Sequence, residues 1–357
     1  MNIYKKIFIA LIIIIFSYIF WRLISKRNQI VKNTEPFSFN IIPDSANSQL
    51  NNLKDSIIKT NMNSLPKAYY NLPLMDFCIK GSYNSAYTGK YINIDMLIYQ
   101  LSRGCRFFDF EVFYIENSES RIFSPQVAYS TDNNFATMDC ENSILLDNVL
   151  SAIVSNAFSS QNTPNNKDPL FINLRIKSKN KKVYKAVAST IDFTIKNNLY
   201  EGKVTKNTPM KDLMRKVVLC IDKTIDFSYK DYTNCDKGDK SCYDLKTYTN
   251  VESGSENMIL NRYNSLLNQK NISLMIKDNN LNTNIQNMNM VLPDIVPENA
   301  PNPVIQQFIM NYGCQIVPFK FYQKDEGLYK YEEFFNDVNG GVIPLSVAII
   351  YFKKKDQ

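Results

Sequence analysis

The chain has 357 residues, 45% of them hydrophobic and 21% charged, so it is long and apolar enough to bury one large core or two modest ones. Lys and Arg outnumber Asp and Glu by 41 to 34, a mild surplus that suits an anionic membrane surface, and no nucleic-acid-binding motif is found. The chain contains no histidine, which excludes His metal ligands and Ser-His or Cys-His dyads and leaves acid-base chemistry to carboxylates, Lys, Tyr, Cys or water.

An apolar run lies close to the N-terminus. Residues 7–21 carry no charge and are flanked by basic residues on both sides. Extended to residues 4–25, the run approaches the length of about 17–25 residues that crosses a bilayer, so we expect a transmembrane anchor. A cleaved signal peptide is the alternative, although no small-x-small cleavage site follows. The denser basic residues on the C-terminal flank favour a single-pass membrane protein whose bulk is cytoplasmic.

Residues 26–71 are rich in Asn, Ser, Lys and Pro, with scattered aliphatic residues. This composition indicates a tether between the anchor and the domain that follows. We expect one helix in it, at about residues 48–60.

Strand-like and helix-like runs alternate after the tether. The expected strands are 77–80, 105–114, 126–130, 169–177 and 216–222, and the expected helices are 94–103, 142–158 and 182–197. Short apolar runs separated by helices predict a parallel sheet that is covered on both faces.

The alternation stops in an Asn-rich stretch at residues 229–289, in which only 272–277 resembles a strand, and resumes at 290–353. There we expect a strand within 312–322, a short helix before Phe335 and a terminal strand at 341–352. A doubly wound sheet would accommodate this order. A closed α/β barrel with a mid-chain insertion fits the terminal strand better, so we predict a distorted (β/α)8 barrel.

The seven cysteines show no CxxC spacing. Four lie within apolar strand-like runs and are expected to be buried thiols: Cys78, Cys105, Cys220 and Cys314. Cys235 and Cys242 lie in a polar stretch instead. They would form a small-loop disulfide in an oxidising compartment, or remain two solvated thiols.

Several separated blocks resemble the X region of phosphatidylinositol-specific phospholipase C. These blocks are GSYNSAYTG (81–89), LSRGCRFFDFEVF (101–113), PQVAYS (125–130), PLFINLRIK (169–177) and KVVLCID (216–222). Residues 312–322 and 332–346 are similar to the end of the Y region of that family. The resemblance implies a phospholipase C-like barrel with an X-like half at 72–228, an insertion at 229–289 and a Y-like half at 290–353.

In that family one histidine acts as general base and another as general acid while the inositol 2-hydroxyl attacks phosphorus. Here Tyr83 and Tyr129 stand at the two histidine positions. Asn84, Asp109 and Glu111 match the family, and the resemblance implies that they bind substrate and calcium. Because a phenol has an ordinary pKa of about 10, it is a poor base at neutral pH, and the resemblance leaves no confident catalytic residue.

Arg175 stands where the family has a further acid, with Lys177 two residues on. It would either replace the metal, neutralising Asp109 and Glu111 while facing a phosphate, or form a buried ion-pair network with them. In the second case Tyr83 would be a packing aromatic.

Two further positions depart from the family. Cys220 falls near the position of the family's basic substrate residue, and residues 290–293 read MVLP where the family has an Arg-x-Tyr-Pro block. We therefore expect a membrane-anchored pseudoenzyme that binds a phosphoinositide, another anionic phosphate or a protein partner. The alternative is an active phosphoric diester hydrolase in which carboxylates, with Arg175 or calcium, replace the missing histidines. An inert barrel that serves as a scaffold is a third interpretation.

Overall fold

The computed structural model describes residues 44–54, 60–116, 121–233, 235, 242–268, 287–295 and 299–356. The expected transmembrane anchor at 4–25 and the strand-like run at 272–277 lie outside these ranges. Within them, no helix has the length and apolar character that a membrane span needs.

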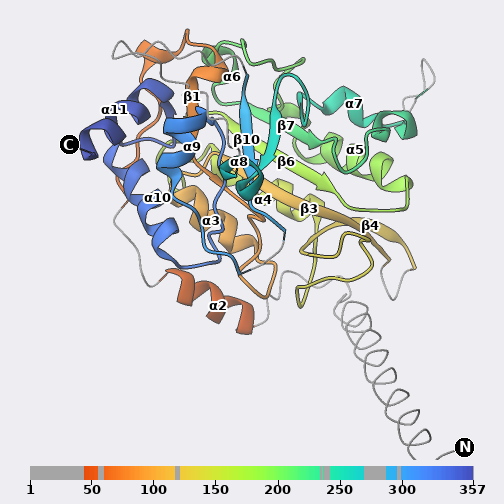
Figure 1. Ribbon diagram of the computed structural model, residues 1–357. Helices are drawn as coiled ribbons and strands as arrows, with labels where there is room; N and C mark the ends of the chain where they lie inside the picture. Colours follow the sequence, from red (N-terminus) through yellow and green to blue (C-terminus); the bar gives the residue numbers. More distant parts are fainter. Residues whose placement is uncertain are drawn as a thin grey trace, which may run out of the picture.

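A twisted parallel sheet forms one side of the molecule (Figure 1). β3 (Phe107–Glu116) runs through its middle, β6 (Leu170–Ile176), β7 (Val217–Asp222) and β8 (Val251–Ser253) follow in parallel on one side, and β2 (Gly81–Ser82) pairs in parallel on the other. The carboxyl ends of these strands meet at one edge, which is where α/β barrels place their sites.

A second set of strands completes the barrel. β9 (Ile259–Arg262) is parallel to β10 (Asn289–Leu292), and single parallel bridges connect β10 through Ile316 to β1 (Phe77–Ile79). Among the described residues no strand ladder joins β8 to β9. The barrel is therefore distorted, as the sequence predicts. Both β8 and β9 lie within the Asn-rich stretch, and the sequence pattern did not predict a strand at either position.

β3 also forms an antiparallel hairpin with β4 (Phe123–Ala128), and β4 pairs with β5 (Ile144–Leu145). The strand expected at 126–130 is thus present but runs against the parallel sheet. β11 (Val342–Pro344) pairs antiparallel with β1.

Helices cover the outside of the strands (Figure 1). The α-helices are α2 (Asp44–Lys54), α3 (Ile94–Ser102), α4 (Leu146–Ala157), α5 (Lys182–Thr194), α6 (Met210–Leu213), α7 (Leu245–Tyr248), α8 (Tyr263–Leu267), α9 (Ile305–Tyr312), α10 (Glu326–Asp337) and α11 (Leu345–Lys355). The 3-10 helices are η1 (Lys67–Tyr69), η2 (Leu74–Asp76), η3 (Lys196–Asn198) and η4 (Tyr229–Thr233). Three of the described helices begin where the side chain of an Asn or Asp accepts a backbone N–H of the first turn, α3 at Asn93, α7 at Asp244 and α10 at Asp325.

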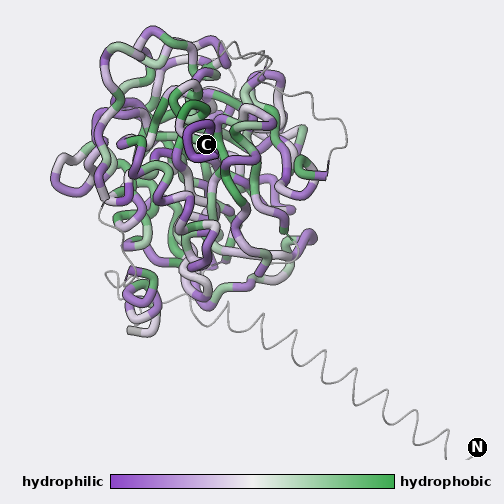
Figure 2. Tube along the Cα trace, turned by 60° about the vertical axis from the view of Figure 1, so that its left-hand side comes forward, coloured by the Kyte–Doolittle hydropathy of each residue, from purple (hydrophilic) through white to green (hydrophobic). Residues whose placement is uncertain are grey.

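The alternation of β3 separates two apolar layers. Phe108, Phe110 and Val112 belong to the cluster under the outer helices, whereas Phe107 belongs to a second cluster inside the barrel. Figure 2 shows green, hydrophobic stretches mainly in the middle of the molecule and purple, hydrophilic stretches in many of its outer loops. The interior cluster includes residues at the starts of β3 and β6, so the polar interior positions of these two strands lie nearer their carboxyl ends.

The terminal strand predicted at 341–352 is wrong beyond β11. Pro344 ends that strand, and Leu345, Ala348, Ile349 and Phe352 form the buried face of α11. Their spacing of three and four residues is helical, and the helix covers the barrel from outside instead of closing it. Residues 312–322 are likewise not a continuous strand, because they pair only through bridges at Ile316 and Phe319.

The cysteines follow the sequence interpretation. Cys78, Cys105, Cys220 and Cys314 are buried free thiols, which confirms that expectation. Cys235 and Cys242 form a disulfide between η4 and α7, so of the two states left open for them the structure has the bonded one.

Asp168 lies in the floor of the barrel, just before β6. Its Oδ1 accepts the Leu65 N–H at 2.7 Å, while its buried Oδ2 has no partner within the described structure. Burial raises the pKa of Asp168 to about 6, although the nearby Arg106 opposes the shift. The folded state therefore keeps a proton on Asp168 over a range of pH in which the unfolded chain has lost it.

We predict that Asp168 makes the protein less stable as pH rises from about 4 to about 6, by about 3 kcal/mol in free energy of unfolding. Above pH 6 its contribution becomes constant. Asp168→Asn keeps the acceptor for Leu65 and should remove this part of the pH dependence. Urea denaturation of both proteins at a series of pH values checks this, and parallel curves from pH 4 to 7 would contradict it.

Candidate functional site

The parallel ladder between β3 and β6 brings the expected site residues together. Asp109 pairs in register with Asn173, and Glu111 pairs with Arg175. The side chains of Asp109 and Arg175 are completely buried, and that of Glu111 is 1% exposed. The sequence-predicted cluster therefore forms, but inside the barrel and not on an open surface.

Arg175 is held on every side of its guanidinium. Its Nε and Nη2 donate to the two carboxylate oxygens of Asp109 at 2.9 and 2.6 Å, and its Nη1 donates to Glu111 Oε1 at 2.7 Å. Nη2 also donates to Asn84 Oδ1 at 2.6 Å. Although burial opposes its charge, Asp109, Tyr83 and Glu111 raise the pKa of Arg175 well above its ordinary value. The guanidinium is thus permanently charged and already paired.

The remaining carboxylate lone pairs are also used. Asp109 Oδ1 accepts from Asn173 Nδ2 at 2.8 Å, and Asp109 Oδ2 accepts the Asn84 N–H at 3.2 Å. Glu111 Oε1 pairs with Lys177 Nζ at 2.9 Å, and Glu111 Oε2 accepts the Ser130 N–H at 2.9 Å. Two acids and two bases therefore form one closed, neutral network.

This network does not fit a calcium ion. Calcium takes six to eight oxygen ligands and needs carboxylate charge, but Asp109 and Glu111 spend theirs on Arg175 and Lys177. The described residues also contain no group of three or more acidic or thiol side chains arranged to hold a metal. The expected metal ligands Asn84, Asp109 and Glu111 are adjacent, yet the guanidinium of Arg175 lies between them.

Tyr83 covers the network. The Arg175 guanidinium carbon lies 4.6 Å from the centre of the Tyr83 ring, and Tyr83 is 3% exposed. Burial raises the pKa of the Tyr83 phenol, an effect that Arg175 only partly opposes. Tyr83, which the resemblance places at the first histidine position, is therefore a neutral phenol whose ring packs against the Arg175 guanidinium.

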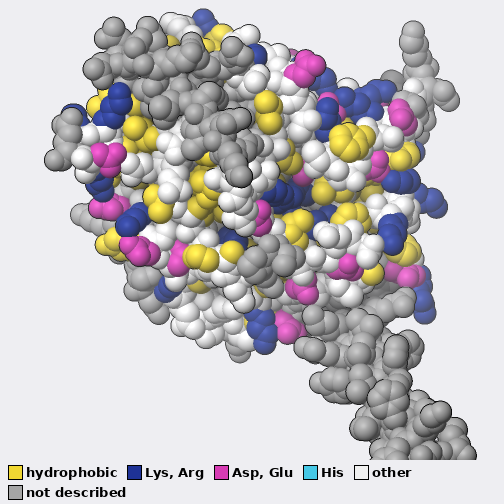
Figure 3. Space-filling view, in the orientation of Figure 1, with side chains coloured by type: hydrophobic (Ala, Val, Ile, Leu, Met, Phe, Trp, Pro, Cys, Tyr) yellow, Lys and Arg dark blue, Asp and Glu magenta, His cyan; other side chains and the backbone are white. Residues whose placement is uncertain are grey.

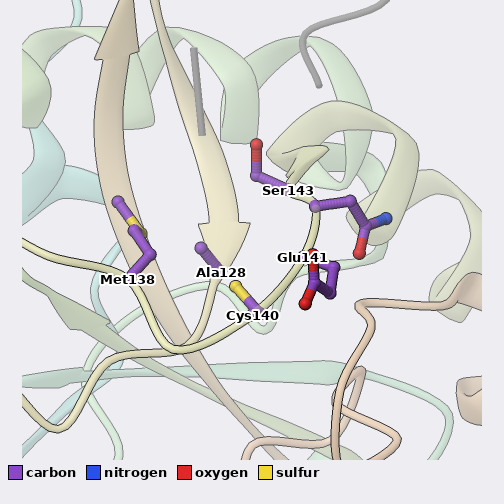
Figure 4. Close-up of a pocket in the computed structure, with 6 residues that line it drawn as sticks. Ala128, Met138, Cys140, Glu141 and Ser143 are labelled. Atoms are coloured by element: carbon purple, nitrogen blue, oxygen red, sulfur yellow. The ribbon is translucent and has the colours of Figure 1, made fainter. Parts of the chain in front are cut away.

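Tyr129, which the resemblance places at the second histidine position, belongs to an aromatic cluster. Its ring stacks on Tyr87 at 4.3 Å, and Tyr322 meets Tyr87 edge-on at 4.8 Å. Beneath it, the Tyr129 N–H donates to Cys140 Sγ at 3.2 Å. Figure 4 shows the Cys140 sulfur directed toward Ala128 in a small cavity. With a volume of about 10 Å³, this cavity holds one water at most.

Two polar residues at the same edge were not recognised as site residues from the sequence. Asp222 ends β7 and is buried, and its Oδ1 accepts from Thr224 while its Oδ2 has no partner in the described structure. Burial raises the pKa of Asp222. Arg262 ends β9, is half-buried, and donates from Nη1 to the Pro293 carbonyl at 2.8 Å.

Arg262 acts electrostatically on Tyr83 and Asp222. Its positive charge is among the influences that oppose the raised pKa values of Tyr83 and Asp222. Among the described residues it forms no ion pair with an acid. In the sequence, Arg262 directly follows the residues ILN. The surrounding stretch is too rich in Asn to indicate a strand that would end at Arg262.

Comparisons with known proteins agree with this fold. Residues 70–223 match the family described as "Phosphatidylinositol-specific phospholipase C, X domain". A search of curated proteins found no match.

Among solved structures, the chain is similar to PLC21 of L. pealei, with 12% identity, a TM-score of 0.53, and coverage of 86% of this chain and 45% of that one. PLC21 of S. officinalis is similar at 15% identity and a TM-score of 0.53, over 92% and 49% of the two chains. The chain thus spans about half the length of these structures, and at such identities the likeness shows the fold alone. Residues 70–223, less than half of the chain, are thus similar to a phosphatidylinositol-specific phospholipase C X domain, and the described chain has an α/β phospholipase C-like fold.

Proposed function

We propose that the protein is a phospholipase C-like pseudoenzyme that binds an anionic phosphate headgroup without cleaving it, and that residues 4–25 anchor it to a membrane. One observation carries the proposal: Arg175 is closed between Asp109 and Glu111 and covered by Tyr83. A cation in that position neutralises the carboxylates that would hold a metal or accept a proton.

The lack of a histidine that could transfer a proton supports the same proposal. The chain has no histidine, and the phenol of Tyr83 stays protonated because burial raises its pKa. Each general acid or base contributes about 10²–10⁴-fold to the rate of such a reaction. With both family histidines replaced, turnover is expected to be lower by about 10⁴-fold or more.

Headgroup binding rests on Arg262, not on Arg175. Arg262 is half-buried at the carboxyl edge and leaves guanidinium donors that no acid engages in the described structure. Arginine presents a planar fork that suits a phosphate. Asn84 Nδ2 is buried without a partner in the described structure, but Asn84 belongs to the closed network around Arg175 and is not counted as part of this site.

We expect Arg262→Ala to weaken binding of inositol 1-phosphate about 10- to 100-fold, the effect of one lost charge-assisted hydrogen bond. Arg215→Ala is the matched control, because Arg215 is exposed just before β7, at the opposite end of the barrel. Isothermal titration calorimetry measures both affinities. Equal losses in the two variants would indicate that only overall charge matters and would reject an Arg262 site.

One observation favours the alternative, an active hydrolase. Asp222 has a raised pKa and an unpartnered carboxylate oxygen at the carboxyl edge, which is the chemistry of a general base. This mechanism would still have to proceed without an accessible Arg175. Hydrolysis that Asp222→Asn abolishes would establish the alternative.

A further inference from the structure

We propose that the outer face of α5, together with η4 and α7, docks on the surface of an anionic lipid bilayer. We call this surface the α5 face and define it by Phe193, Phe227, Tyr232 and Tyr243. The inference does not depend on headgroup binding at the barrel opening, because none of these residues contributes to that site.

The α5 face carries the two most exposed large hydrophobic side chains of the described structure. Phe193 is 75% exposed and Phe227 is 74% exposed, while Tyr232 is 38% exposed. Burying such rings is favourable, and no element of the described chain covers them. Phe193 also lies beside Tyr243, with 5.7 Å between the ring centres.

Specific contacts make these aromatic residues one surface. Tyr232 of η4 stacks on Tyr184 of α5 at 5.4 Å, and Lys181 Nζ lies 4.6 Å from the centre of the Tyr232 ring. Lys181 also pairs with Asp226, the residue before Phe227. Both η4 and α7 pack against α5, so the rings are presented by a rigid support.

The charges on this face leave a positive surplus. Five acids of the described residues lie on it, and lysines form ion pairs with four: Asp192 with Lys196, Asp226 with Lys181, Asp244 with Lys246, and Glu252 with Lys230. The fifth acid is Asp231 of η4, against six lysines on the same face. Lys182 and Lys185 are exposed on α5, and no ion pair of the described residues engages them. Figure 3 shows yellow hydrophobic atoms beside dark blue Lys and Arg atoms over the region of α5 and α7.

Exposed aromatic rings among unpaired lysines complement the interfacial region of an anionic bilayer. Phenylalanine and tyrosine rings insert at headgroup depth, and lysines are attracted to the negative surface potential. An acidic protein would match the same charges. The bilayer is favoured because the chain also carries the apolar run at residues 7–21, which would keep the domain close to a membrane.

Depth-dependent fluorescence quenching tests this docking on the full chain. The only tryptophan, Trp21, is first replaced by Phe, and a single tryptophan is then introduced by Phe193→Trp, Phe227→Trp or Tyr329→Trp. Tyr329 is the matched control, since it is 59% exposed on α10, across the barrel from α5 in Figure 1. Each protein is reconstituted into phosphatidylcholine vesicles with brominated acyl chains, with or without about 30% phosphatidylserine.

We expect the bromolipid to reduce fluorescence about twofold or more at positions 193 and 227 in the anionic vesicles, and to leave position 329 unchanged. Lys182→Glu with Lys185→Glu should abolish this quenching while the circular dichroism spectrum stays the same. Equal quenching at position 329, or none at 193 and 227 in either lipid, would overturn the proposal. Binding of an acidic protein to this face without any lipid quenching would overturn it in favour of that partner.

Discussion

Replacing Arg175 by Met is expected to lower the free energy of unfolding by about 3–5 kcal/mol, the cost of leaving one side of a buried ion pair uncompensated. Among the described residues, Asp109 would lose its only cationic partner, and Glu111 would keep only Lys177. Urea denaturation at pH 7 measures the loss. A cost below about 1 kcal/mol would show that Arg175 is not closed in the network and is free to face a ligand.

A double variant that keeps the network neutral is the control for Arg175→Met. Because the network contains two acids and two bases, Asp109→Asn combined with Arg175→Met leaves the neutral Glu111–Lys177 pair. We expect this double variant to recover most of the stability lost by Arg175→Met. Arg121→Met removes an exposed arginine on the β3–β4 hairpin and should change stability by less than about 0.5 kcal/mol.

Glu332→Gln is expected to cost about 3 kcal/mol, because one carboxylate neutralises two buried cations. Lys80 is completely buried, with its Nζ 2.6 Å from Glu332 Oε1, and Arg103 Nε donates to Glu332 Oε2 at 2.5 Å. The cluster of Lys80, Arg103 and Glu332 joins the C-terminal end of α3 and the end of β1 to α10. Chemical denaturation at pH 7 checks the value.

Lys80→Met is the matched comparison for Glu332→Gln. It leaves the Arg103–Glu332 pair intact and replaces the lysine stem by a side chain of similar volume. We expect it to cost only about 1 kcal/mol. If Lys80→Met destabilised the protein more than Glu332→Gln, the lysine would be held by its hydrogen bond to the Arg103 carbonyl instead of by the carboxylate.

The central strands were predictable because they depend on local pattern, whereas the cluster at Asp109, Glu111 and Arg175 was expected from the resemblance to the phospholipase C family. The alternation of β3 places Asp109 and Glu111 on one face, and the buried run of β6 places Arg175 beside them. What the sequence left open was whether Arg175 turns to a ligand or to the acids. That choice depends on distances between strands, and in the structure Arg175 turns to the acids.

Asp222 and Arg262 are two candidate site residues that the sequence pattern could not identify. They are far apart in the chain, and they lie close enough to interact electrostatically because β7 and β9 end at the same edge. β9 has only four residues, all partly exposed, so it lacks the apolar signature of a buried strand. The terminal helix α11 was misassigned for the opposite reason, since its apolar run is also compatible with a strand.

Release of inositol phosphate from phosphatidylinositol vesicles by the full chain, with and without calcium, is the most direct measure of whether this site has lost its chemistry. We predict no release above the uncatalysed background in either condition, together with inositol 1-phosphate binding that depends on Arg262. Release that calcium stimulates, or that Asp222→Asn abolishes, would show instead that the protein is an active phosphodiesterase.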